Sequence, residues 1–159
     1  MIIRICAFAV AATLVLAHPV AAQPSDAVVS EQATFRIIEV ARGLDRPWSL
    51  AFLPDGRMLV TEKPGALRIV GADGAVSEPV AGVPEVVAAN QGGLLDVAVH
   101  PDFANNKLIY LTYSGPGDDG ASTELARGRL EDGRLSNVEV LFAAAPKMPS
   151  SKHFGSRIA

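Results

Sequence analysis

The chain has 159 residues and a formal net charge of −3, with 19% charged and 49% hydrophobic residues. This is enough for one ordinary domain, and most of it should fold around a core rather than stay disordered. The acidic balance argues against a nucleic-acid-binding protein, which usually carries a basic face. The single cysteine excludes a disulfide framework and a zinc site built from several thiolates.

Residues 1–22 have the order of a secretory signal peptide. Arg4 supplies a basic start, the stretch that follows it to Ala17 is apolar and uncharged, and Val20-Ala21-Ala22 offers small residues before a cleavage point. The apolar stretch is shorter than the roughly 20 residues that span a bilayer, although a retained anchor is the alternative. We therefore expect cleavage, a periplasmic protein with no membrane anchor, and an extended lead-in over residues 23–34.

The remainder, residues 35–159, reads as short β-strands separated by turn residues. Three Asp-Gly pairs lie between apolar runs, at 55–56, 73–74 and 132–133, and such pairs indicate hairpins because glycine tolerates positive φ. No segment shows helical periodicity over ten or more residues, so we predict an all-β fold. The expected strands are residues 35–40, 48–53, 57–62, 66–70, 76–80, 94–99, 107–113, 123–130 and 138–142. Residues 115–120 are expected to form a flexible loop.

Two parts of the chain resemble each other. Residues 50–55 (LAFLPD) match residues 97–102 (VAVHPD), and three further apolar runs follow each copy. Four strands that repeat about every 40 to 50 residues are typical of β-propeller blades, with chance similarity of short patterns as the alternative. A third copy begins at residues 157–159. The sequence thus predicts two blades and the start of a third, with further blades beyond Ala159. A small domain that closes by forming oligomers is the other reading.

The segments that lead into innermost strands gather at one mouth of a propeller channel. Gln91 precedes the second such strand and His153 the third, at similar spacing, so we expect both side chains to face one pocket. An imidazole titrates near neutral pH, which makes His153 a candidate general base, although a lone histidine is more often structural. The amide of Gln91 can hydrogen-bond a polar ligand, unless Gln91-Gly92-Gly93 is a simple turn. Trp48 and His100 are interpreted as structural residues.

Three blocks together resemble the glucose/sorbosone dehydrogenase family of soluble quinoproteins. They are LDRPWSLAFLPDG at 44–56, QGGLLDVAVHPDF at 91–103 and HFGSRI at 153–158, and the similarity extends over about residues 35–159. The nearest branch is the periplasmic aldose sugar dehydrogenases. The resemblance implies a six-bladed propeller that holds pyrroloquinoline quinone (PQQ) at the channel mouth, with calcium as a second cofactor.

The resemblance also implies roles for individual residues. His153 would take the proton of the anomeric hydroxyl of an aldose while the C1 hydride passes to PQQ, which yields a lactone, and Gln91 would contact the quinone. An external electron acceptor would then take the electrons. Lys152 stands where glucose-oxidising relatives have an acid, which argues against a preference for glucose. The family's calcium ligands come from later blades, so they are expected beyond Ala159, and this chain alone is expected to be an inactive fragment.

Two other classes of protein stay open at this stage. A secreted propeller hydrolase of the lactonase type would need a metal and carboxylates at the mouth, where the sequence offers Asp45 but no carboxylate cluster. A non-catalytic propeller that binds glycans or proteins would need neither the quinone nor a base at His153.

Overall fold

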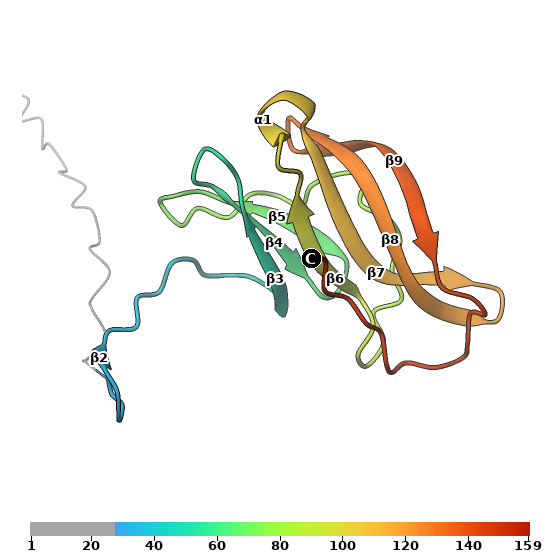
Figure 1. The fold of residues 1–159 in the computed structure, drawn as a ribbon, viewed down its shortest axis with the longest axis horizontal. Helices are drawn as coiled ribbons and strands as arrows, with labels where there is room; N and C mark the ends of the chain where they lie inside the picture. Colours follow the sequence, from blue (N-terminus) through green and yellow to red (C-terminus); the bar gives the residue numbers. More distant parts are fainter. Residues whose placement is uncertain (1–27) are drawn as a thin grey trace, which may run out of the picture. The chain divides into compact units, whose positions relative to one another are not determined.

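The computed structural model describes residues 28–159 and is built almost entirely from antiparallel β-sheet, which confirms the predicted all-β class (Figure 1). The predicted signal peptide over residues 1–22 lies outside the described residues. One sheet, here called blade 1, has the order β3 (Pro47–Phe52), β4 (Met58–Glu62) and β5 (Ala66–Val70). The other, blade 2, has the order β6 (Leu94–Val99), β7 (Leu108–Gly117), β8 (Gly120–Glu131) and β9 (Arg134–Ala143). The chain thus forms the first two blades of the predicted propeller.

A separate two-stranded ladder precedes the blades. It joins β1 (Val28–Val29) to β2 (Thr34–Phe35) and belongs to a compact unit that ends at Glu39, whereas residues 40–159 form the second unit. The strand expected over residues 35–40 is therefore wrong beyond Phe35. The run is rich in β-formers, but propensity alone makes no strand unless a neighbouring edge pairs with it.

The predicted Asp-Gly turns form as expected. Asp132 and Gly133 both have positive φ, 48° and 71°, which is the pattern of a type I′ hairpin between β8 and β9. The expected flexible loop over residues 115–120 is wrong, because β7 continues to Gly117 and pairs it with Gly120. The side chain of Lys147 fills the space over Gly117, where a Cβ would lie 2.1 Å from its Cδ. The glycine that suggested a loop instead makes room for a side chain crossing the hairpin.

The fourth strand of blade 1, expected over residues 76–80, is reduced to a single bridge between Val70 and Val76. The segment still runs beside β5, since Val80 N–H donates to Leu67 O at 2.8 Å. At Ile69, however, the backbone N–H donates to the hydroxyl of Ser77 at 3.0 Å. A side-chain oxygen has replaced the backbone acceptor that a ladder would use, and this ends the regular strand.

The main hydrophobic core lies between the two blades. Val97 of β6 packs there with Leu59 and Leu67 of blade 1 and is only 4% exposed. Leu50 holds the equivalent position in β3 and is 47% exposed. Blade 1 therefore covers one face of blade 2. The corresponding face of blade 1, which carries Leu50, is not covered by any other part of residues 28–159. This pattern is what stacked blades produce.

A short helix, α1 (Phe103–Asn106), interrupts the second repeat between β6 and β7. Phe103 is buried in the core, and Lys107 ends the helix in the left-handed conformation at φ 58°. Within the described part of the chain, no helix combines the length and hydropathy that a membrane crossing requires.

Candidate functional site

Three segments distant in sequence are joined at one end of the sheets. They are residues 44–48, which lead into and begin β3, residues 90–93 before β6, and residues 150–158 at the C-terminal end. Lys63, directly after β4, connects the first two, because its N–H donates to Arg46 O at 3.0 Å and its carbonyl accepts from Leu94 N–H at 3.1 Å. The third is attached through Gln91 N–H, which donates to Ser151 O at 3.0 Å. We call this region the mouth.

Gln91 and His153, the two candidate site residues, meet at the mouth. The backbone N–H of His153 donates to Oε1 of Gln91 at 2.8 Å, although the residues are 62 positions apart. Both residues are exposed, so they are accessible to a ligand. The contact joins the amide of Gln91 to the backbone of His153. The catalytic and cofactor-binding roles of the two residues remain predictions.

Each mouth segment contains one non-glycine residue in the left-handed region. These are Arg46, Asn90 and His153, with φ of 51°, 50° and 66°. Such a conformation costs roughly 1–2 kcal/mol for a residue with a Cβ, and it persists only where the surroundings impose it. Strained residues of this kind concentrate at functional sites, and here one occurs on every segment that forms the mouth.

Asp96 connects the three innermost segments beneath the mouth. Its side chain is almost fully buried, and it accepts from Ser49 Oγ at 2.5 Å and from Ile158 N–H at 2.8 Å. Arg157 Nη1 lies 3.7 Å from the same carboxylate. Ser49, Asp96 and Arg157 are the equivalent positions of the sequence repeat, so the structure places corresponding residues of successive blades in contact. Sequence reasoning missed Asp96, although an acid inside the apolar run LLDVAV was a signal.

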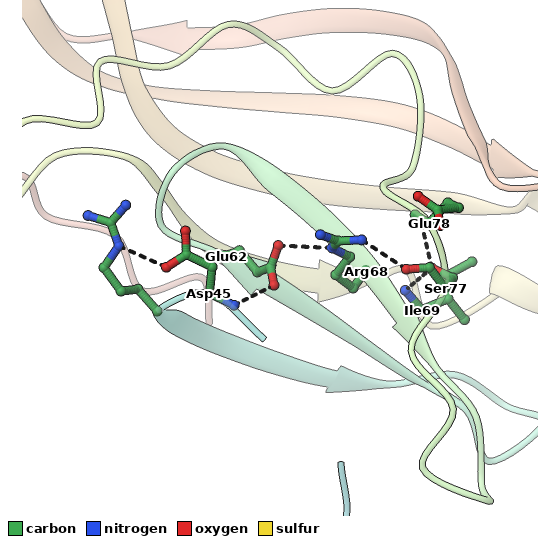
Figure 2. A network of polar contacts seen from close by, with 7 residues as sticks. Asp45, Glu62, Arg68, Ile69, Ser77 and Glu78 are labelled. Carbon is green, nitrogen blue, oxygen red and sulfur yellow. Dashed lines mark hydrogen bonds and ion pairs between the residues drawn. The ribbon is translucent and has the colours of Figure 1, made fainter. Parts of the chain in front are cut away.

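Glu62 is a second buried carboxylate, and it fixes the first mouth segment to blade 1 (Figure 2). It accepts from Asp45 N–H at 2.7 Å and from Arg68 Nε at 2.9 Å. Arg68 in turn donates to Ser77 O at 3.0 Å. Both charged groups of this network, Glu62 and Arg68, therefore have hydrogen-bond partners, which a buried carboxylate requires. The network holds the entry to β3 in place.

Cations gather at the mouth of a chain whose overall charge is negative. The ammonium of Lys63 donates to Asn90 O and lies 5.9 Å from the centre of the Trp48 ring, so it bridges the first two segments. Lys152 and Arg157 come from the third segment and are exposed. Their combined field favours an anionic ligand at this end of the blades. Lys63 was also missed, because its place at the mouth depends on the pairing of β4 with β3.

His153 borders a pocket of about 300 Å³. The other lining residues are Ala121, Ser122, Thr123, Ala144, Pro146, Met148, Ser150, Lys152 and Phe154. Gln91 is not among them, since it meets His153 from the backbone side. No group of three or more His, Cys, Asp or Glu residues able to hold a metal occurs within residues 28–159. The described residues therefore offer no cluster of acidic side chains for calcium.

His100 belongs to the turn before α1, away from the mouth. Its Nδ1 accepts from Asp102 N–H at 2.9 Å, and its ring stacks on Tyr110 at a centroid distance of 6.1 Å. These contacts support its interpretation as a structural residue.

A largely buried polar cluster attaches Lys147, which precedes the third mouth segment, to β7 and β8 of blade 2. Tyr113 OH donates to Glu124 Oε2 at 2.8 Å across the β7–β8 pair, and Lys147 forms an ion pair with the same carboxylate. Lys147 also donates to Gly115 O at 3.0 Å. Burial, and secondly the carboxylate of Glu124, raise the pKa of Tyr113 well above the usual tyrosine range.

Tyr113 is therefore expected to ionise later than an ordinary tyrosine when the folded protein is titrated with base. Because the pKa of Tyr113 is higher in the folded than in the unfolded state, neutral Tyr113 contributes fully to folding stability below pH about 10. This contribution is lost as the pH rises further. The difference in ultraviolet absorbance between the parent and Tyr113→Phe measures the ionisation of Tyr113, and Tyr110 is the other tyrosine within residues 1–159. Tyr113→Phe should remove the late component and Tyr110→Phe should leave it. A Tyr113 component at the ordinary pKa would contradict the expectation.

Comparison with known proteins now identifies the family. The profile of the glucose/sorbosone dehydrogenase family matches residues 44–159, and the chain belongs to this family. It is 44% identical over 138 residues to the aldose sugar dehydrogenase YliI of Escherichia coli. This alignment covers 84% of this chain and 37% of that protein.

Solved structures agree with this assignment. The apo-form crystal structure of the soluble aldose sugar dehydrogenase from E. coli superimposes with a TM-score of 0.72 at 44% identity, over 76% of this chain and 36% of the other. The PQQ-bound aldose sugar dehydrogenase from Streptomyces coelicolor gives 0.65 at 29% identity, over 74% and 35%. The chain thus spans about a third of the length of these relatives.

Proposed function

We propose that the complete protein is a PQQ-dependent aldose dehydrogenase that oxidises the anomeric C1 hydroxyl of aldose sugars to lactones. The observation that carries this proposal is the contact between Gln91 and His153 at the mouth, in a chain of this family. The relatives support it, because they include named aldose sugar dehydrogenases and one structure with PQQ bound.

The described residues fit PQQ, which is a polycarboxylate quinone. Lys63 and Lys152 place cations at the mouth, and the amide of Gln91 offers hydrogen-bond donors to quinone or carboxylate oxygens. When bound, PQQ supplies an acceptor for the C1 hydride. The residues do not fit calcium, since residues 28–159 hold no cluster of ligating side chains, so we derive no step through that ion.

His153 acts in this proposal as the general base. Its imidazole takes the proton of the anomeric hydroxyl as C1 loses a hydride, so the C–O bond becomes the carbonyl of the lactone. Because His153 is exposed, the proton can then pass to water. Lys152 precedes His153 at the position where glucose-oxidising relatives are expected to have an acid. This opposite charge disfavours glucose as the preferred sugar.

The proposal extends to the location and to the electron acceptor. The signal peptide expected over residues 1–22 would deliver the protein to the periplasm, where an external acceptor would reoxidise the cofactor.

The test of the proposed function is to purify the complete protein, add PQQ, and follow dye reduction and lactone formation with a panel of aldoses. We expect activity that depends on both quinone and sugar. Hydrolysis of lactones without quinone, or no binding of PQQ at all, would contradict the proposal.

A further inference from the structure

The contact between Gln91 and His153 fixes the orientation of the Gln91 amide. The backbone N–H of His153 is a donor, so the side-chain atom 2.8 Å away must be the carbonyl oxygen and not the NH₂ group. The two ends of this amide are therefore not interchangeable. Oε1 is used by His153, and Nε2, which has no partner among the described residues, keeps both of its N–H donors for a ligand.

His153 needs such a contact because its backbone is in the left-handed region, at φ 66°. The direction in which the imidazole leaves the chain depends on that backbone conformation. Gln91 holds the segment at two points, since its own N–H also donates to Ser151 O at 3.0 Å. One residue thus clamps positions 151 and 153 and leaves the His153 imidazole outside the clamp.

Gln91 is itself held in place from both sides. Lys63 Nζ donates to the carbonyl of the preceding residue, Asn90. Gly92 N–H donates to Ala89 O at 2.8 Å, and Gly93 N–H donates to Ser114 Oγ at 2.7 Å. A Cβ on Gly93 would lie 2.1 Å from Lys63 O, so the backbone approaches too closely there for any other residue. The Gln91 turn therefore provides a rigid support for the clamp.

We propose that Gln91 is a positioning residue for His153: its Oε1 holds the His153 backbone, which commits its NH₂ group to an acceptor oxygen on the ligand. The proposal rests on the function proposed above, in which His153 is the base and PQQ is the ligand. It goes further by separating two roles within one side chain. The ligand atom facing Gln91 must be a hydrogen-bond acceptor, such as a quinone carbonyl or a carboxylate.

Two substitutions in the complete protein separate these roles. Gln91→Glu keeps an acceptor for the His153 N–H but has no donor for the ligand. Gln91→Leu is similar in size and has neither. Gln32→Leu makes the same chemical change in the separate N-terminal unit and is the matched control. Three quantities are measured: hydrogen exchange of the peptide spanning residues 150–155, the dissociation constant of PQQ, and kcat at saturating PQQ.

We expect both Gln91 variants to bind PQQ at least about tenfold more weakly, since each loses the donor. Exchange at His153 should stay slow in Gln91→Glu and rise about tenfold or more in Gln91→Leu. At saturating PQQ, kcat should fall on the order of 100-fold in Gln91→Leu, because a misplaced general base lowers the rate of the chemical step. The decrease of kcat in Gln91→Glu should be at least tenfold smaller than in Gln91→Leu. Gln32→Leu should match the parent protein in all three measurements.

Other outcomes overturn specific parts of the proposal. If exchange is unchanged in Gln91→Leu and its kcat recovers at saturating PQQ, Gln91 is a cofactor contact without a positioning role. If Gln91→Glu exchanges as fast as Gln91→Leu, the acceptor does not hold His153. If Gln91→Glu binds PQQ as tightly as the parent, the ligand atom is not an acceptor. If the parent protein neither binds PQQ nor oxidises aldoses, the proposed function fails, while the exchange measurement still decides whether the clamp exists.

Discussion

Replacement of His153 by alanine is expected to lower kcat of the complete enzyme by about 10²–10⁴-fold, the usual contribution of a positioned general base. The affinity for PQQ should change much less, because the contact that Gln91 accepts comes from the His153 backbone, which alanine retains. Steady-state dye reduction and a PQQ titration measure the two effects separately.

The backbone of residue 153 needs its own control, because its φ of 66° is strained for any residue with a Cβ. His153→Gly removes the imidazole and the strain together, so activity should be as low as in the alanine variant. His100→Asn is the matched histidine control. His100 lies in the turn before α1, and an asparagine oxygen can accept the Asp102 N–H in place of Nδ1. Activity retained in His153→Ala, or lost equally in His100→Asn, would contradict the role assigned to His153.

Most strands could be predicted because their signals are local. The run 66–70 and the run 94–99 are observed with the expected bounds, since each is apolar and flanked by turn residues. The hairpin at 115–120 was predicted as a loop because of its glycines, of which Gly117 leaves space for Lys147 from elsewhere in the chain. The shortened run 76–80 failed for a related reason, since a serine hydroxyl replaces a backbone acceptor.

The mouth was only partly predictable, because its contacts join segments that are distant in sequence. The sequence repeat placed Gln91 and His153 at comparable positions before successive innermost strands, and the structure brings them together. The repeat could not show that Gln91 meets the backbone of His153 rather than a shared ligand. Glu62 ends β4 and Lys63 follows it, and which loops these two residues bind depends on how β4 pairs with its neighbours. Single-sequence reasoning does not supply such contacts.

Asp96→Ala is expected to destabilise the protein by about 2–4 kcal/mol, which would make it one of the more damaging single changes in blade 2. The buried carboxylate accepts hydrogen bonds from Ser49 and Ile158, and its removal leaves both donors without this partner. The exposed Arg157 contributes little, because a solvent-screened ion pair at 3.7 Å is weak. Asp96→Asn should cost less, since the amide keeps one acceptor for the Ile158 N–H.

The free energy of unfolding of the complete protein, from urea titration, measures this effect. Asp119→Ala is the matched control, because Asp119 is exposed in the β7–β8 turn and its loss should change stability by less than about 0.5 kcal/mol. Asp96 also fixes the backbone five residues after His153, so kcat should fall in Asp96→Ala even where the variant is fully folded. Equal stability of Asp96→Ala and Asp119→Ala would show that Asp96 does not join the innermost strands. Reduced stability with unchanged kcat would confine Asp96 to the fold and leave the clamp of Gln91 as the contact that positions His153.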